Sequence, residues 1–189
     1  TFVYAPDPGF VGTDVFQYEA TDGVRSTAAF ASITVYATAE ELTLANLRDI
    51  GIAALNYESA KNRFPFNGAN AAHYDASGNP YLSWRVHLLP YLGYQSLYAQ
   101  FRLDEPWDSP HNLPLSAKMP AVFADASGAV GAGLTRFQMF GAEGTEYYWR
   151  RSATGLLIGP SESQVTDGLD NTLLAVEAPT SMAGGWTRP

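Results

Sequence analysis

The chain has 189 residues, of which 46% are hydrophobic and 16% charged, and its formal net charge is −8 at pH 7. These values are typical of one globular domain, or of one domain plus part of another, and they exclude a disordered chain. With 11 lysines and arginines in all and no cysteine, the sequence also excludes a basic nucleic-acid surface, disulfides and thiolate chemistry.

No stretch of the sequence reaches the roughly 18 uninterrupted apolar residues that span a bilayer, and no signal-peptide pattern is present. We therefore predict no membrane insertion by this segment. Because residues 1–4 already have a strand-like pattern, we expect the chain to be part of a longer polypeptide. Its export signal or anchor would then lie outside this sequence.

The first 36 residues have the alternating pattern of β-strands. Three short runs place apolar side chains at every second position, which puts them on one face of a sheet: Phe2 and Tyr4; Phe16, Tyr18 and Ala20; and Ala31, Ile33 and Val35. Asp22 and Gly23 mark a turn between the second and third runs. We predict β-structure throughout this part.

The apolar runs alternate with turn residues in a specific order, which includes Pro6, Gly9, Gly12 and Asp14. This order resembles the C-terminal part of a bacterial cadherin-like or Ig-like surface repeat. The resemblance implies that residues 1–37 are the closing strands of a β-sandwich from an exported surface protein. The strands that would complete the sandwich are missing from this sequence.

A long helix is predicted to begin at residue 38, where Thr38 and Glu41 have the spacing of a capping box. The apolar residues that follow recur at helical spacing: Leu47, Ile50, Ala54 and Tyr57. Pro65 requires extended backbone before it, so we expect the helix to end near Asn62. A helix of this length needs a surface to pack on, and we predict an antiparallel sheet.

Short helices and then strands are predicted for the rest of the chain. Ser83 can cap a helix that Pro90 interrupts or restarts. Strand-like runs follow at residues 121–123, 134–140, 147–149 and 172–176. The predicted fold class is therefore α+β, with a long N-terminal helix packed on an antiparallel sheet and preceded by a partial β-sandwich segment.

Four sequence motifs carry a second resemblance: NLRDIG at 46–51, RFP at 63–65, SWRV at 83–86 and LDEPWDSPHN at 103–112. They resemble a large paralogous family of exported planctomycete proteins of unknown function. Members begin with a prepilin-type apolar segment, and their helix and sheet resemble type II secretion pseudopilins. The resemblance implies that residues 38–189 form a pseudopilin-like domain. Here the β-sandwich tail stands in place of the apolar segment.

The three histidines, His73, His87 and His111, fit no catalytic or zinc-binding motif. The neighbours of His87 in the sequence are apolar, which is typical of a core position. His111 follows Asp108 by three residues, and a metal or catalytic role there competes with bracing of the loop.

Three acidic residues of the block at 103–112, Asp104, Glu105 and Asp108, could be read as a glycosidase carboxylate pair. Carboxylates this close together in a proline-rich loop are better explained as caps and turn braces. We predict that Trp107 is buried and that Asp108 or Ser109 caps the following turn. We predict no enzymatic activity and no catalytic residue.

Calcium is the one cofactor that the sequence suggests. Asp167, Asp170 and Asn171 place three oxygen-bearing side chains within five residues, and calcium prefers such ligands. The resemblance adds that major pseudopilins hold calcium in a loop late in the chain. The alternative is an Asp167-Gly168 turn that opens a strand and needs no ion.

Two hypotheses about function follow, from different classes. In the first, the chain is a non-enzymatic structural module of an exported cell-surface or extracellular protein. It would assemble with copies of itself, or with neighbouring domains of the parent chain, into a filament, sheath or surface layer.

In the second hypothesis, the chain is an extracellular module that binds a solute or a glycan through exposed aromatic side chains. The candidate stacking residues are Trp84, Tyr91, Tyr94, Tyr98, Trp107, Tyr147, Tyr148 and Trp149. Core packing is the alternative explanation for these aromatics, because several of them recur at helical or strand spacing.

Overall fold

The computed structural model describes residues 3–65, 71–139, 150–151 and 157–189. Contacts between residues divide the chain into two compact units, Thr1–Leu42 and Thr43–Pro189. The identities predicted for residues 1–37, a β-sandwich fragment, and for residues 38–189, a pseudopilin-like domain, stay predictions.

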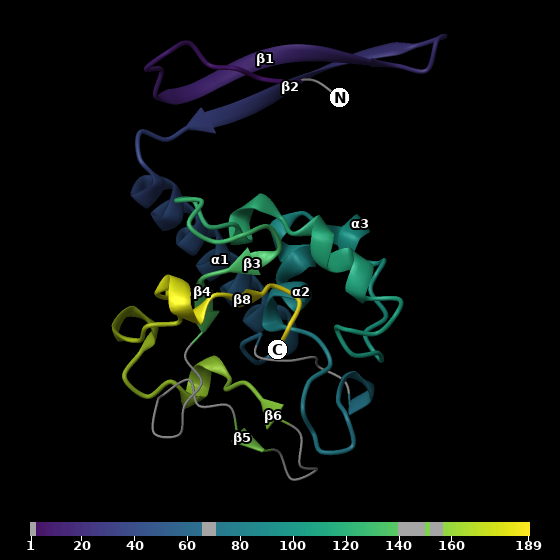
Figure 1. Cartoon of the computed structure of the whole chain (residues 1–189), viewed down its shortest axis with the longest axis vertical. Coiled ribbons are helices and arrows are strands. Elements are labelled where there is room, and N and C mark those ends of the chain that lie inside the picture. Colours follow the sequence, from purple (N-terminus) through teal and green to yellow (C-terminus); the bar gives the residue numbers. More distant parts are fainter. Residues whose placement is uncertain (1–2, 66–70, 140–149, 152–156) are drawn as a thin grey trace. The chain divides into compact units, whose positions relative to one another are not determined.

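The first unit contains an antiparallel hairpin of strands β1 (Gly12–Thr21) and β2 (Ser26–Val35), drawn in Figure 1. The strands pair without interruption from Gly12 opposite Val35 to Thr21 opposite Ser26. The carboxylate of Asp22 accepts hydrogen bonds from the backbone N–H groups of Val24 (2.9 Å) and Arg25 (2.8 Å), which confirms the predicted turn.

The first predicted strand run is not confirmed. Tyr4 is not in a strand, and Phe2 lies outside the described residues.

The second unit begins within helix α1 (Ala39–Lys61). The hydroxyl of Thr38 accepts a hydrogen bond from the N–H of Glu41 (3.1 Å), as the capping pattern predicts. The carboxylate of Glu41 reaches back to the N–H of Ala37 (3.0 Å), one residue further than in a standard capping box. Asn62 follows the helix with φ of +55°, a left-handed conformation that asparagine tolerates, so the predicted end of the helix is confirmed.

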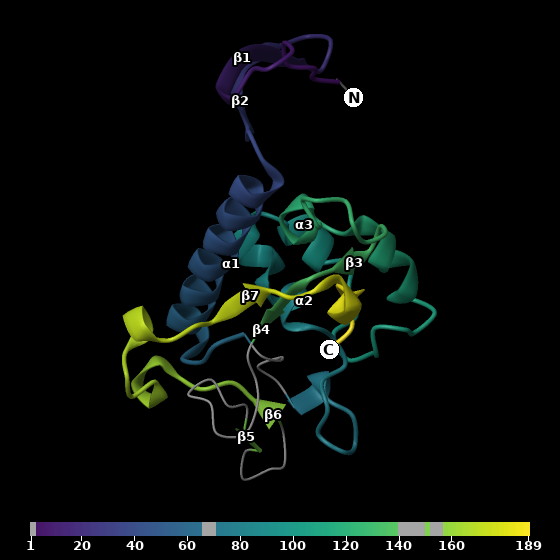
Figure 2. The same cartoon turned by 60° about the vertical axis from the view of Figure 1, so that its left-hand side comes forward.

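One face of α1 is buried: Thr43, Asn46, Ile50, Ala53, Ala54 and Tyr57. Of the predicted core positions Leu47 is only partly buried. Leu44, an apolar residue of the same helix, is 61% exposed. Figure 2 shows α1 beside strand β7 (Ala175–Glu177), where the hydroxyl of Thr43 donates to the carboxylate of Glu177 (3.4 Å). The α+β class, with strands before the helix and small antiparallel sheets after it, is confirmed.

The helical segments after α1 are mostly single turns, and several begin at or next to proline. The α-helices are α2 (Trp84–Leu88) and α3 (Gln95–Tyr98), and the 3-10 turns are Ala71–His73, Leu89–Leu92, Leu113–Lys118, Ala121–Phe123, Glu162–Gln164, Leu169–Asn171 and Thr180–Met182. Ser83 caps α2 by accepting from the N–H of Arg85 (3.3 Å), as predicted. The strand predicted at 121–123 is wrong: this run is a 3-10 turn that follows Pro120 and turns Phe123 into the core.

The strands of the second unit are shorter than the sequence predicts, and among the described residues they pair two by two. The pairs are β3 (Leu134–Thr135) with β8 (Gly184–Gly185), β4 (Phe137–Met139) with β7, and β5 (Arg150–Arg151) with β6 (Leu157–Ile158). The strand predicted at 147–149 and the end of that at 134–140 lie outside the described residues.

The core of the second unit is strongly aromatic. Trp186, at the C-terminal end of the chain, is fully buried and lies edge-on to Phe101 (ring centroids 5.9 Å apart) and stacked on Phe123 (6.2 Å). Trp84 meets Phe123 edge-on (6.1 Å). No helix in the described part of the chain combines the length and the apolar character needed to cross a membrane.

We predict that replacing Ile50 with Asp lowers the free energy of unfolding by about 3 kcal/mol or more, because Ile50 is fully buried and the carboxylate would have no partner there. Leu44→Asp is the matched control on the same helix, since Leu44 is exposed, and its cost should stay within about 0.5 kcal/mol. Urea denaturation followed by circular dichroism measures both. Equal costs would contradict the packing of α1 described above.

Candidate functional site

The block at residues 103–112 forms a closed loop around the side chain of Asn112, which is fully buried. The carbonyl of its side-chain amide accepts from the N–H of Arg102 (3.0 Å). Its NH₂ group donates to the backbone carbonyls of Arg102 (2.9 Å), Glu105 (3.0 Å) and Pro106 (3.1 Å). One side chain thus satisfies four backbone groups of a loop that has no strand or helix partner.

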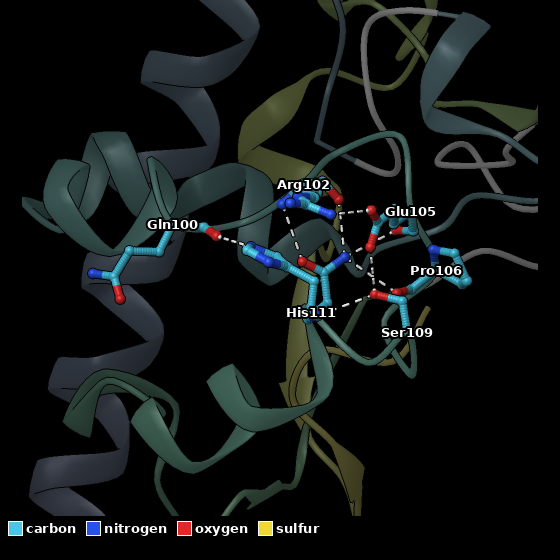
Figure 3. A network of polar contacts seen from close by, with 7 residues as sticks. Gln100, Arg102, Glu105, Pro106, Ser109 and His111 are labelled. Carbon is cyan, nitrogen blue, oxygen red and sulfur yellow. Dashed lines mark hydrogen bonds and ion pairs between the residues drawn. The ribbon is translucent and has the colours of Figure 1, made fainter.

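Polar side chains reinforce the same loop from outside (Figure 3). The hydroxyl of Ser109 donates to the carboxylate of Glu105 (2.8 Å) and accepts from the N–H of Asn112 (3.1 Å), which confirms the predicted cap. Arg102 forms an ion pair with Glu105 (2.8 Å), and the hydrogen bonds from Arg102 and Ser109 lower the pKa of that carboxyl. Nε2 of His111 donates to the carbonyl of Gln100 (2.9 Å), so this histidine braces the loop.

Among the remaining residues of the block, only the burial of Trp107 differs from the prediction. Trp107, predicted to be buried, is half-buried, because it lies at the edge of the core with the guanidinium of Arg188 over its ring (5.9 Å). Asp104 and Asp108 are exposed. The block is therefore a loop that its own polar side chains hold closed. The prediction of no enzymatic activity stays a prediction.

The candidate calcium residues Asp167, Asp170 and Asn171 all lie in one exposed turn. The carboxylate of Asp167 accepts from the hydroxyl of Thr172, and the side-chain amide of Asn171 donates to the carbonyl of Asp167 (2.9 Å). These bonds hold the turn without an ion. Within the described residues no group of three or more histidine, cysteine or acidic side chains is placed to hold a metal. Calcium at this turn stays a prediction.

Of the eight candidate stacking aromatics, Trp84 is buried, and Tyr147, Tyr148 and Trp149 lie outside the described residues. Tyr94 is exposed. Tyr91, Tyr98 and Trp107 are half-buried, and ligand binding by these rings stays a prediction.

His87 is buried in the core, as predicted, and is only 4% exposed. Its ring lies 5.8 Å from that of His73, nearly parallel to it. Nε2 of His87 and Nδ1 of His73 are buried without a hydrogen-bond partner among the described residues. Burial, and secondarily the neighbouring His73, lowers the pKa of His87 to about 3, and burial also lowers the pKa of His73. The sequence carries no local signal of this pairing, because a turn and a loop separate the two histidines.

The hairpin of β1 and β2 has exposed apolar side chains and unpaired strand edges. Its register places Phe16, Tyr18, Ile33 and Val35 on one face and Val15 and Phe30 on the other, so both faces carry apolar side chains. Phe30 is 72% exposed. In the described part of the chain neither strand pairs with a third strand, and β2 has no charged residue along its ten positions.

Comparison with known families identifies the class of protein. A family described as a protein of unknown function (DUF1559) matches residues 44–150, which is more than half of the chain. The chain therefore belongs to this family. The match covers α1 from residue 44 onward, the loop around Asn112, and His73 and His87, and it begins after the hairpin. No curated protein and no solved structure matches the chain.

We predict that Asn112→Ala lowers the free energy of unfolding by about 2 to 4 kcal/mol, because the N–H of Arg102 and the carbonyl of Glu105 lose their hydrogen bonds to the amide. The carbonyls of Arg102 and Pro106 lose one bond each and keep the bonds from the N–H groups of Glu105 and Ser109. Asn171→Ala is the matched control, since Asn171 is exposed and donates a single bond. Its cost should be within about 0.5 kcal/mol. A similar loss in both variants, measured by chemical denaturation, would contradict the role given to Asn112.

Stability should also fall with acidification in a range set by His87. Its pKa is lowered from 6.5 to about 3 on folding, so the unfolded chain binds the additional proton between these values. The stabilisation is complete above pH 6.5 and is lost as the pH falls, at about 1.4 kcal/mol per pH unit for this residue. The lowered pKa of His73 acts in the same direction.

Denaturation midpoints between about pH 7 and pH 5 measure this slope, before the carboxylates begin to titrate. His87→Phe should reduce the slope. An unchanged slope in His87→Phe would show that this residue titrates normally in the folded protein.

Proposed function

We propose that the chain is a non-enzymatic structural module of an exported cell-surface or extracellular protein. In this proposal it assembles with copies of itself, or with neighbouring domains of its parent chain, into a filament, sheath or surface layer. The hairpin β1–β2 makes the main contact. The observation that carries the proposal is the exposure of apolar side chains on both faces of this two-stranded hairpin.

A two-stranded hairpin is marginally stable alone in water, so an exposed one with apolar faces gains stability from a partner. Burying one phenylalanine such as Phe30 contributes about 1.5 to 3 kcal/mol. The outer edge of β2 favours strand addition, because edge strands that avoid pairing usually carry charges or prolines and β2 has neither. β1 is less suited to it, since it carries Asp14 and Glu19.

The finer parts of the proposal rest on resemblance and on the order of elements. A long helix followed by small antiparallel strands agrees with a pseudopilin-like architecture, and a β-hairpin before it agrees with the end of a cadherin-like or Ig-like repeat. Both resemblances belong to exported proteins, which supports an extracellular or cell-surface location. The side chains of Asn112, Ser109 and His111 form hydrogen bonds to backbone groups in or next to the block. This supports a non-enzymatic role for the block.

We predict that the chain self-associates with rising concentration and that Phe30→Lys weakens this association by roughly tenfold or more, since it places a charge on the contact surface. Val24→Lys is the matched control: Val24 is 90% exposed and lies in the turn rather than on a strand. Sedimentation velocity over a range of concentrations measures both variants.

A fragment that begins at Thr38 should be folded and monomeric, because the buried residues of the second unit all come from residue 43 onward. Circular dichroism and sedimentation check this. A monomeric full chain, or equal effects of Phe30→Lys and Val24→Lys, would contradict assembly through the hairpin.

A further inference from the structure

A cavity of about 280 Å³ opens in the second unit, beside the C-terminal half of α1. Four segments that are distant in the sequence line it: α1, the 3-10 turn 71–73, the helical stretch 87–91 and α3. The lining residues are Tyr57, Lys61, His73, His87, Pro90, Tyr91, Gln95 and Tyr98. The proposed assembly through the hairpin does not use this cavity.

Tyrosine rings supply most of the apolar wall of the cavity. Tyr57 is almost fully buried and meets Tyr91 edge-on, with ring centroids 5.5 Å apart and an interplanar angle of 65°. Tyr91 and Tyr98 are only half-buried, so part of each ring is free to contact a ligand. Such rings pack against the C–H faces of cyclic molecules while their hydroxyl groups reach polar atoms.

The polar atoms of the cavity are the two unpartnered imidazole nitrogens. Nε2 of His87 and Nδ1 of His73 are buried and have no hydrogen-bond partner among the described residues. Buried polar groups without partners are rare in folded proteins, and such a group in a cavity is satisfied by whatever occupies it. Both side chains line this cavity. The two nitrogens themselves have almost no exposed surface, so an occupant would reach them only once the imidazole rings turn toward the cavity.

The charge of the site disfavours a cationic occupant. Burial lowers the pKa of both histidines, so both imidazoles are neutral at neutral pH. The ammonium group of Lys61 at the rim opposes binding of a cation. Neutral imidazole nitrogens do not compensate the charge of an anion, but they exchange hydrogen bonds well with hydroxyl groups, which both donate and accept.

We propose that this cavity binds a single pyranose sugar, with the sugar ring against Tyr91 and Tyr98 and its hydroxyl groups on His87, His73 and Gln95. The volume lies near the lower end of the range for small-molecule sites, about 300 to 1,000 Å³, which suits one ring rather than an oligosaccharide. A zinc-type metal site fits less well, because structural and catalytic zinc sites use three or four protein ligands and only two histidines line the cavity.

Saturation-transfer difference NMR on the whole chain tests the proposal, with glucose, galactose, mannose and N-acetylglucosamine as probes. At least one of the four should receive saturation, and isothermal titration should then give its affinity. Gln95→Ala removes an exposed amide at the rim and should weaken binding about 5- to 10-fold without affecting folding. His87→Phe keeps the buried ring but removes Nε2, and it should weaken binding at least as much.

Matched controls exist for both variants. Gln100→Ala changes an exposed glutamine outside the cavity, and His111→Phe changes a histidine of the loop around Asn112. Both should bind the sugar like the parent chain. Three results would overturn the proposal: no saturation transfer to any of the four sugars, equal losses in Gln95→Ala and Gln100→Ala, or histidine NMR signals that shift with zinc while no sugar binds.

Discussion

The burial of Trp186 between Phe101 and Phe123 is the contact on which the second unit depends most. These three rings come from the C-terminal end, from the stretch after α3 and from a 3-10 turn, and among the described residues no long strand joins these segments. The indole N–H of Trp186 donates to the carbonyl of Ser116 (2.7 Å), and its backbone N–H donates to the carbonyl of Gly133 (3.1 Å). One residue thus connects the C-terminal end to the segments that hold Phe101, Ser116, Phe123 and Gly133.

Short elements of this kind leave many backbone groups without a helical or sheet partner, and side chains satisfy them instead. Asn112 does this for the loop at 102–106. Buried Arg85 donates to the hydroxyl of Ser83 (2.9 Å) and to the backbone carbonyl of Phe137, and its guanidinium lies over the ring of Trp84 (4.5 Å). Burial lowers the pKa of Arg85 to about 9, which leaves it charged at neutral pH. A buried polar side chain is costly to lose in such a fold.

The two interaction features proposed here differ in physical character. The hairpin offers exposed apolar side chains and a strand edge, which suit a large protein partner and give little chemical selectivity. The cavity offers two fixed polar atoms between aromatic walls, which suit one small molecule of defined shape. The family match covers the segments that line the cavity but not the hairpin. The two features can therefore serve separate roles in one chain.

Local signals in the sequence determined the elements that short-range physics controls. The cap at Thr38, the apolar spacing from Ile50 to Tyr57, the cap at Ser83 and the turn at Asp22 all depend on residues within a few positions of each other, and all are confirmed. The sequence also pointed to the cap at Ser109, because a serine three residues before Asn112 can reach its N–H.

Only the tertiary structure decided which of these elements meet. The 3-10 turn at 121–123 replaced a predicted strand because Pro120 begins a turn there and no described strand pairs with it. Leu44 is exposed although it is apolar, and Trp107 stays at the edge of the core, since the neighbours that would cover them are set by distant segments. The approach of His73 to His87, and the buried amide of Asn112, likewise depend on how loops close. Loop closure is governed by long-range packing, and no local spacing encodes it.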